Sequence, residues 1–184
     1  MAVFCDKMRA MSSAFAELEP NVEPLGPVSG FVDEFVEAVS PEPFFADWSR
    51  AETALFSDYL DCYGVPSNSM VLREGDEGNF LAILVTGRAL ILKTFQGVEK
   101  VVHEMHTGEL VGEMSLIDGQ PRFASCLAVE PSDFAVLTYD NLRRLLIEEP
   151  QLGNKLLLKL LELSTQRLRK STLQMLPELM PWSA

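Results

Sequence analysis

The first regular pattern of apolar residues lies near the N-terminus and has the period of a helix. Its members recur with the spacing of one helix face, at Phe31, Val32, Phe35, Val36 and Val39. Pro41 and Pro43 follow, and they end the predicted helix. Residues 1–28 hold three prolines among glutamates, which indicates a partly ordered extension rather than a packed element.

A second helix is predicted to begin after Ser49. Ser49 and Glu52 stand in the S-x-x-E spacing of a capping box, in which each side chain satisfies a backbone N–H at the helix start. The predicted apolar face of this helix comprises Leu55, Phe56, Tyr59 and Leu60.

From Ser69 onward the apolar residues follow the period of strands. Short apolar runs alternate with glycine-containing turns at intervals of roughly eight to twelve residues. The predicted strands are 70–72, 80–85, 89–93, 98–105, 123–129 and 134–138. Many short strands with regular turns are typical of an all-β barrel or roll.

The chain becomes helical again after the last strand. Asp140 is predicted to cap a helix over 142–149, and Pro150 to open a long helix that runs to about Met175. Its leucines form two stripes, one at positions 156, 160 and 163 and the other at 157, 161 and 168, with Met175. One contact with the roll requires less apolar surface than this, so the helix is predicted to have a second contact face.

Composition narrows the class of protein. The net charge of −12 repels polyanions, which argues against direct DNA binding or an acidic membrane surface as the main partner. No apolar run approaches the ~20 residues of a membrane span. The three cysteines are scattered without a Cys-x-x-Cys pair, so they are interpreted as reduced thiols of a cytoplasmic protein.

One segment, residues 108–126, carries candidate chemistry. Gly112 and Gly119 bracket a short helix, and the first N–H groups of such a helix lack internal partners and can bind an anion. Arg122 adds a guanidinium that can hold a phosphate through two parallel hydrogen bonds. Glu113 would repel a phosphate, so its carboxylate is better used to accept a hydrogen bond from a neighbouring sugar hydroxyl. The segment therefore predicts a site for a phosphate with an adjacent ribose.

These residues also resemble a known motif. Gly112-Glu113 followed by Pro121-Arg122-x-Ala124-Ser125 is similar to the phosphate-binding cassette of the cyclic nucleotide-binding domain family. That family includes the catabolite activator protein, the regulatory subunits of the cAMP-dependent protein kinase and cyclic nucleotide-gated channels. Residues 73–79 resemble a turn that the family places early in its β-roll. The resemblance covers about residues 44–170.

The resemblance implies a mainly β fold with flanking helices (α+β). The expected architecture is an antiparallel β-roll of the jelly-roll or double-stranded β-helix type. N-terminal helices, a short cassette helix and a long C-terminal helix flank this roll. The corresponding division of the chain is an N-terminal extension with one amphipathic helix at 1–43, a cyclic nucleotide-binding domain at 44–176 and a tail at 177–184.

The resemblance also implies the ligand site. The expected ligand-binding residues are Gly112, Glu113, Met114, Ser115, Arg122, Phe123 and Ala124. Glu113 would accept the ribose 2′-hydroxyl, backbone N–H groups of residues 113–115 would cradle the cyclic phosphate, and Arg122 would neutralise it. The expected ligand is cAMP, with cGMP as the other candidate; no cofactor and no metal are expected.

Phe123 departs from the family pattern, which usually has alanine, serine or threonine there. In a strand Phe123 would share a face with Ser125, and the preferred interpretation is that its ring turns into the core of the roll. The alternatives are that the ring crowds the pocket or stacks on the purine. Because Phe123 has no hydroxyl for a guanine contact, cAMP is favoured over cGMP.

Two further groups of residues have competing interpretations. His103 and His106 do not have the spacing of a helical metal site, and surface histidines are the preferred interpretation, although His103 could approach the ligand. Arg167, Arg169 and Lys170 could complement the dipole of the long helix, or Arg167 or a neighbouring leucine could cover the base.

No catalytic triad, activated cysteine or P-loop is recognisable, so enzymatic activity is not expected. The predicted function is that of a soluble, stand-alone cyclic nucleotide sensor in which ligand closes the C-terminal helix. The alternative is a degenerate member of the family that serves as a protein-interaction module, with Phe123 filling the pocket. A homodimer through the C-terminal helix and an unidentified protein partner are both left open.

Overall fold

The computed structural model describes residues 22–179, with side chains through residue 173. Its first elements are β1 (Glu23–Pro27), the 3-10 helix η1 (Val28–Phe31), α3 (Val32–Val39), the 3-10 helix η2 (Pro43–Phe45), α4 (Arg50–Ser57), β2 (Asp61–Val65), β3 (Ser69–Leu72) and β4 (Phe80–Thr86). The later ones are β5 (Ala89–Phe95), β6 (Val98–Met105), β7 (Leu110–Val111), α5 (Glu113–Asp118), β8 (Ser125–Ala128), β9 (Ser132–Thr138), α6 (Tyr139–Glu148) and α7 (Pro150–Leu179).

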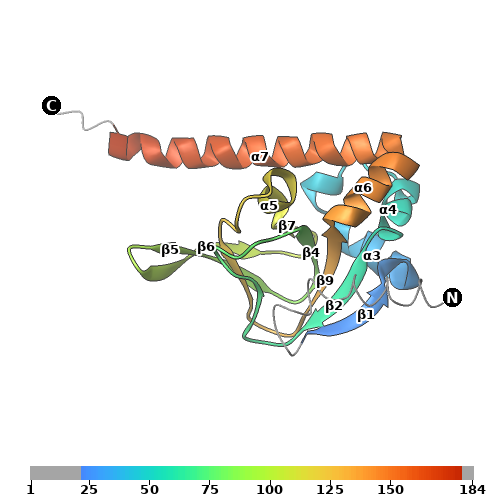
Figure 1. Ribbon diagram of the computed structural model, residues 1–184, viewed down its shortest axis with the longest axis horizontal. Coiled ribbons are helices and arrows are strands. Elements are labelled where there is room, and N and C mark those ends of the chain that lie inside the picture. The colour runs from blue at the N-terminus through green and yellow to red at the C-terminus, as the bar shows by residue number, and fades with distance from the viewer. Residues whose placement is uncertain (1–21, 180–184) are drawn as a thin grey trace.

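The strands form two antiparallel sheets that face each other as a roll (Figure 1). One sheet has the order β1-β2-β9-β4-β7, and the other has the order β3-β8-β5-β6. Neighbours in each sheet are far apart in the chain, as in β2 against β9 and β3 against β8. The architecture confirms the expected mainly β fold with flanking helices, an antiparallel roll and a long C-terminal helix.

Strand β4 separates two apolar cores. Its residues Phe80 to Leu84 are an unbroken apolar run, and successive side chains of a strand point to opposite faces. Phe80, Ala82 and Leu84 pack inside the roll, whereas Leu81 and Ile83 pack on its outer face against the helices. A strand that is buried on both faces has a continuous apolar sequence. Strand β4 therefore contributes side chains both to the core inside the roll and to the core between the roll and the helices.

Helix α7 covers the helical layer and extends beyond the roll (Figure 1). Leu156 and Leu160 are fully buried in the outer core, and Leu163 packs against it. This arrangement confirms the first predicted leucine stripe. At the start of α4, Ser49 and Glu52 form the predicted capping box, and Lys155 of α7 donates to both oxygens of Glu52 at 3.0 Å. The cap therefore also joins α4 to α7.

The prediction for the end of the second helix was wrong. Helix α4 ends at Ser57, and Tyr59 and Leu60 lie in the turn that leads into β2, a strand absent from the sequence prediction. The backbone carbonyl of Tyr59 accepts a hydrogen bond from the Asn141 side chain, 82 positions away in the chain. Such a tertiary contact has no local signature.

Other element boundaries also differ from the predictions. Part of the N-terminal extension is packed, since β1 pairs with β2; residues 1–21 lie outside the described residues. The α6 cap is Thr138, whose hydroxyl accepts the backbone N–H of Asn141, and Asp140 lies in the first turn. Strand β8 begins at Ser125, two residues later than predicted. The division of the chain into domains at residues 43/44 and 176/177 stays a prediction.

Candidate functional site

The predicted short helix is present as α5, and a glycine with left-handed backbone opens it. Gly112 is the N-cap residue with φ 83°, a conformation that glycine adopts without the penalty of a Cβ atom. The first N–H groups of a helix, here those of Glu113 to Ser115, have no partner within the helix. Glu113 and Ser115 are buried, and Met114 is largely exposed. The backbone donors are thus gathered at the carbonyl end of β7.

Arg122 is buried beside this helix. Its side chain is only 3% exposed, and its Nη1 donates to the carbonyl oxygens of Phe80 at 2.7 Å and Gly112 at 2.9 Å. The guanidinium lies over the Phe80 ring, with Cζ 4.3 Å from the ring centroid. These contacts hold the guanidinium at the start of β4, next to the N-terminus of α5.

The loop between β3 and β4 encloses Arg122 from another side. The N–H of Arg122 donates to Asp76 O at 2.8 Å, and the N–H of Gly75 donates to Arg122 O at 2.9 Å. A Cβ atom built on Gly78 would overlap Arg122 Nε and Cζ and would lie 2.6 Å from Nη2. Gly78 is therefore required for the close approach of the guanidinium to this loop. This loop contains residues 73–79, the turn that resembles the family motif. Its backbone and Gly78 contact Arg122.

Arg122 carries a buried charge with an unused hydrogen-bond donor. Among the residues whose side chains are described, no carboxylate ion-pairs with the guanidinium, and its buried Nη2 has no hydrogen-bond partner. Burial lowers the pKa of Arg122 to about 10, against the opposing effect of the Glu113 and Asp76 carboxylates, so the side chain is charged at neutral pH. A buried cation with an unused donor is costly unless an anion pairs with it. An anion bound beside Nη2 would supply this partner.

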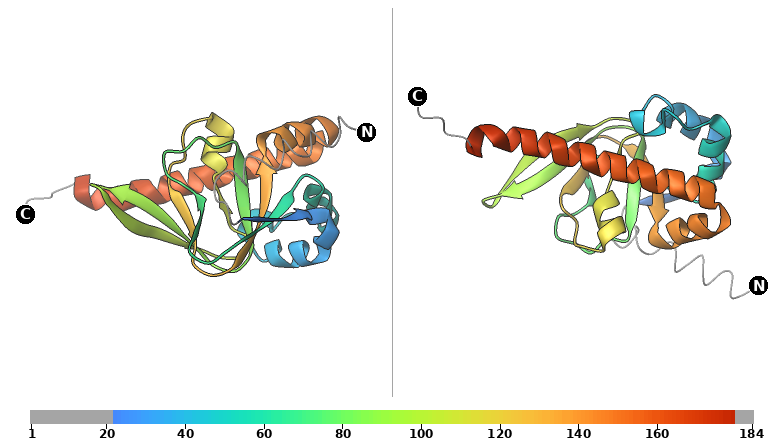
Figure 2. Two further views of the ribbon diagram at one scale, coloured as in Figure 1. Left: turned by 60° about the horizontal axis from the view of Figure 1, so that its bottom comes forward. Right: turned by 90° about the horizontal axis from the view of Figure 1, so that it is seen from above.

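Glu113 lies at the same site and is held by the long helix. Its side chain is only 2% exposed, and its Oε1 is ion-paired with Nη1 of Arg167 on α7. Nη2 of Arg167 donates to Leu110 O at 2.8 Å. Figures 1 and 2 show α5 directly beside α7. The carboxylate is therefore tied to α7.

This contact corrects the dipole interpretation of Arg167. Helix α7 continues to Leu179, so Arg167 is not in its last turn. No local pattern joins positions 113 and 167, so the partner of Arg167 could not be predicted from the sequence.

The preferred interpretation of Phe123 was wrong. Its side chain is 61% exposed, and Nζ of Lys93 lies 4.1 Å from the ring centroid. Residues 122–124 precede β8, so Phe123 and Ser125 do not share a strand face: Ser125 is buried and Phe123 is outside. The ring therefore fills neither the core nor the space beside Arg122. Ala124 is half-buried between them.

The histidines of β6 and of the following turn bond to one carboxylate. Glu109 Oε2 lies 2.8 Å from His103 Nε2 and accepts the backbone N–H of His106 at 2.9 Å. Both contacts belong to the turn that leads into β7. Within residues 22–173, no cluster of three or more potential metal-ligating side chains is present.

Over the same described part of the chain, no helix is long and apolar enough to cross a membrane.

Comparison with known proteins gives a consistent result. The family model described as "Cyclic nucleotide-binding domain" matches residues 64–149, which include α5, Arg122 and the loop around Gly78. The crystal structure of a cyclic nucleotide-binding domain from Methylobacillus flagellatus KT has a TM-score of 0.76 and 39% sequence identity. The similarity covers 86% of this chain and 90% of that one.

Two curated relatives are larger proteins. The regulatory subunit of cAMP-dependent protein kinase from Aspergillus niger is 34% identical over 114 residues, which are 62% of this chain and 26% of that protein. The cyclic AMP receptor protein of Thermus thermophilus is 28% identical over 134 residues, 72% of this chain and 60% of that protein. The chain thus spans about a quarter of the kinase subunit and less than two thirds of the bacterial receptor.

Proposed function

The chain belongs to the cyclic nucleotide-binding domain family, and on this premise we propose that it is a cAMP-favouring sensor or regulatory module that responds through α7. The observation that carries the proposal is the state of Arg122: a buried guanidinium with a free donor and no carboxylate partner among the described residues. A cyclic phosphate would accept from Nη2 and from the first N–H groups of α5. Each such charge-assisted hydrogen bond contributes about 1.5–3 kcal/mol.

The ribose contact would involve Glu113. Its carboxylate is buried and already accepts from Arg167, and an ionised carboxylate has further lone pairs for a sugar hydroxyl. A 2′-hydroxyl that donates to Glu113 would therefore lie close to Arg167. Ligand that excludes water from this pair strengthens the attraction between the two side chains, because the local dielectric constant falls.

This arrangement supports closure of α7 as the response. Arg167 is a polar side chain through which α7 contacts the cassette helix, and it bonds both Glu113 and the Leu110 carbonyl. A ligand shifts the position of a helix only if it binds one position more tightly than the other. A ribose bonded to Glu113 meets this condition, since it stabilises the position of α7 in which Arg167 is paired.

The preference for cAMP rests on Phe123. An amino acid without a hydroxyl at this position offers no side-chain donor or acceptor to a guanine. The alternative function, a family member without ligand, required Phe123 to fill the pocket. The exposed ring of Phe123 provides no such plug.

Calorimetry with cAMP, cGMP and 5′-AMP tests the proposed function. We expect cAMP to bind more tightly than cGMP, and both to bind more tightly than 5′-AMP, whose dianionic open phosphate does not match the geometry of a singly charged diester. Hydrogen exchange measured on the same samples should show that cAMP slows exchange in α7 around residues 162–170. Absence of heat with any of the three nucleotides, with no protection of α7, would contradict the proposal.

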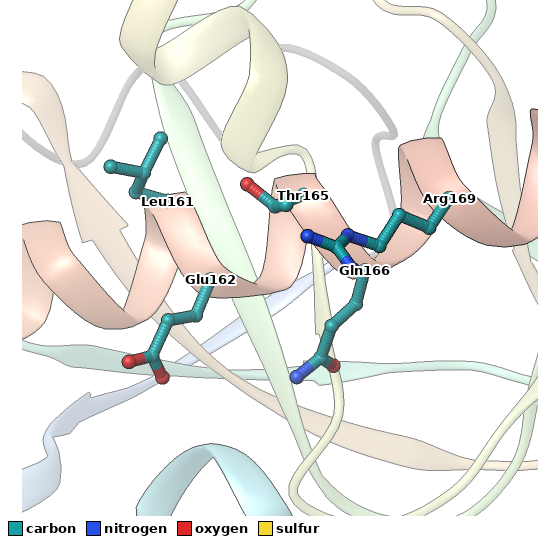
Figure 3. Close-up of a pocket in the computed structure, with 5 residues that line it drawn as sticks. All are labelled: Leu161, Glu162, Thr165, Gln166 and Arg169. Carbon is teal, nitrogen blue, oxygen red and sulfur yellow. The ribbon is translucent and has the colours of Figure 1, made fainter.

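The outer face of α7 supports a second proposal, a homodimer. Leu158, Leu161 and Leu168 are each more than 60% exposed, and together with Thr165 and Thr172 they repeat at intervals of three and four residues. This spacing is that of a coiled-coil seam. Figure 3 shows Leu161 and Thr165 on one side of α7, with Glu162 and Gln166 on the other; these four residues and Arg169 line one pocket. The seam therefore has a polar border, as a helix dimer requires.

The double substitution Leu161→Glu with Leu168→Glu tests the seam. Wild-type protein is expected to have about twice the 20.5 kDa mass of the chain in light scattering, and the double variant the mass of one chain, since buried like charges oppose pairing. Leu173→Glu is the matched control, because Leu173 is equally exposed but lies off the seam. A dimer of ordinary affinity would be formed at protein concentrations of about tens of micromolar. If the wild-type protein is a monomer at these concentrations, the homodimer proposal is wrong.

A further inference from the structure

One half-buried lysine joins three segments around the anion site. Lys93 lies on β5, and its Nζ donates to the carbonyl oxygen of Phe123 at 2.6 Å and to Glu74 Oε1 at 2.7 Å. The same ammonium lies over the Phe123 ring, 4.1 Å from its centroid. Phe123 directly follows the anion-binding arginine, and Glu74 belongs to the loop that encloses it. Lys93 thus joins β5, this loop and the arginine segment at one point.

Further hydrogen bonds continue this connection. Glu74 Oε2 accepts the backbone N–H of Thr94 at 2.8 Å, and the N–H of Glu74 donates to Ser125 Oγ at 2.9 Å. The Lys93 ammonium holds the pKa of Glu74 below its ordinary value, so the carboxylate is ionised and able to accept both bonds. Both oxygens of Glu74 are therefore bonded to β5, and its backbone is bonded to β8.

These contacts matter because Arg122 has no carboxylate to orient it among the described residues. Its guanidinium is bonded to the carbonyls of Phe80 and Gly112, and its backbone is bonded to Asp76 and Gly75 of the loop that contains Glu74. Residues 122–124 are not part of a strand ladder, since β8 begins at Ser125. Cross-links to neighbouring segments must therefore supply the rigidity that a strand would otherwise give. Lys93 supplies the link at Phe123.

We propose that Lys93 is a positioning residue of the anion site: by tying the Phe123 carbonyl and ring to Glu74, it fixes the segment that carries Arg122. The identity of the anion as a cyclic phosphate rests on the proposed function, whereas the positioning role of Lys93 does not. The proposal also gives Phe123 a role. The Phe123 ring forms a cation–π contact with the Lys93 ammonium on the outside of the protein. It does not fill the anion site.

The chain offers a matched control in Lys100. Lys100 lies directly opposite Lys93 on β6, and its Nζ also lies near an aromatic ring, 5.6 Å from the centroid of Phe95. Replacement of either lysine by methionine removes one positive charge from the same hairpin. Only the replacement of Lys93 breaks the bonds to Glu74 and Phe123. The comparison of the two variants therefore separates the effect of losing one positive charge from the effect of losing the bonds that position Phe123 and Glu74.

The first measurement is hydrogen exchange on the ligand-free protein. We expect Lys93→Met to speed exchange about tenfold in peptides that contain the N–H groups of Gly75 and Arg122, the effect of losing one charge-assisted bond. Lys93→Arg should restore most of the protection, and Lys100→Met should leave these peptides as in the wild type. Equal protection in Lys93→Met and wild type, or equal loss in Lys93→Met and Lys100→Met, would overturn the proposal.

The second measurement is the affinity for cAMP. Lys93→Met should weaken binding about five- to tenfold, with recovery in Lys93→Arg and a change of less than about twofold in Lys100→Met. Affinity that is equal in Lys93→Met and wild type would also overturn the positioning role. If the wild-type protein bound no cyclic nucleotide, the proposed function would fail, whereas the exchange measurement would still decide the role of Lys93.

Discussion

Arg122→Ala is expected to weaken binding of cAMP by about 100-fold or more. The substitution removes the guanidinium that would pair with the cyclic phosphate, and two charge-assisted hydrogen bonds of about 1.5–3 kcal/mol each correspond to at least a factor of ~100. Arg122→Lys should recover only part of this loss. A lysine ammonium carries all its donors on one atom, so it cannot reproduce the planar fork in which Nη1 bonds the carbonyls of Phe80 and Gly112 while Nη2 faces the ligand.

The stability of the unliganded fold should change much less. Loss of Arg122 leaves two carbonyl oxygens without their donor, which destabilises the fold, but it also removes a desolvated charge without a counterion, which stabilises it. We expect the net change in the free energy of unfolding to stay within about 1–2 kcal/mol. Arg50→Ala is the control for net charge, since Arg50 is an exposed arginine whose ion pair is with Asp33. Calorimetry and thermal unfolding on these three variants give both quantities. An affinity of Arg122→Ala within about threefold of the wild type would refute the assignment of the phosphate site.

Gly78→Ala is expected to weaken binding of cAMP by tens of fold without removing any ligand-binding group. The added methyl would overlap the guanidinium of Arg122, and contacts this short force a neighbour to move. The Gly78 backbone is not in the left-handed region, so steric overlap rather than backbone strain is the cause. Displaced from its bonds to Phe80 O and Gly112 O, the guanidinium would no longer face the N-terminus of α5. Misplacement by about 1 Å is enough to cost a large factor at a preorganised site.

Gly30→Ala is the matched control for Gly78→Ala. A Cβ atom at Gly30 meets nothing within 4 Å, and its backbone is likewise outside the left-handed region. Both substitutions therefore add one methyl group and restrict the backbone to the same extent. Only the methyl group at position 78 contacts Arg122. Calorimetric affinities of the two variants, with a crystal structure of Gly78→Ala, check the prediction. The prediction fails if Gly78→Ala binds cAMP as tightly as Gly30→Ala does.

Most of the architecture could be predicted from local patterns. Alternating apolar runs between glycine turns identified the strands from β3 to β6, and the capping box of Ser49 and Glu52 identified the start of α4. These signals are short-range, because the residues that form a turn or a cap are adjacent in the chain. The elements that failed depend on distant partners. Strand β2 is defined by pairing with β1 and β9, and the turn before it is bonded to Asn141.

The sequence by itself determined which segment carries the proposed anion site of this protein, because Gly112, the short helix and Arg122 lie within eleven residues. Only the tertiary structure decided what surrounds it. Arg167 reaches Glu113 across 54 positions, Gly78 makes room for a guanidinium from another loop, and Lys93 holds Phe123 on the outside. The physical reason is that burial of Arg122 and the ion pair of Glu113 depend on side chains that folding brings together from separate elements, and no spacing along the chain encodes those distances.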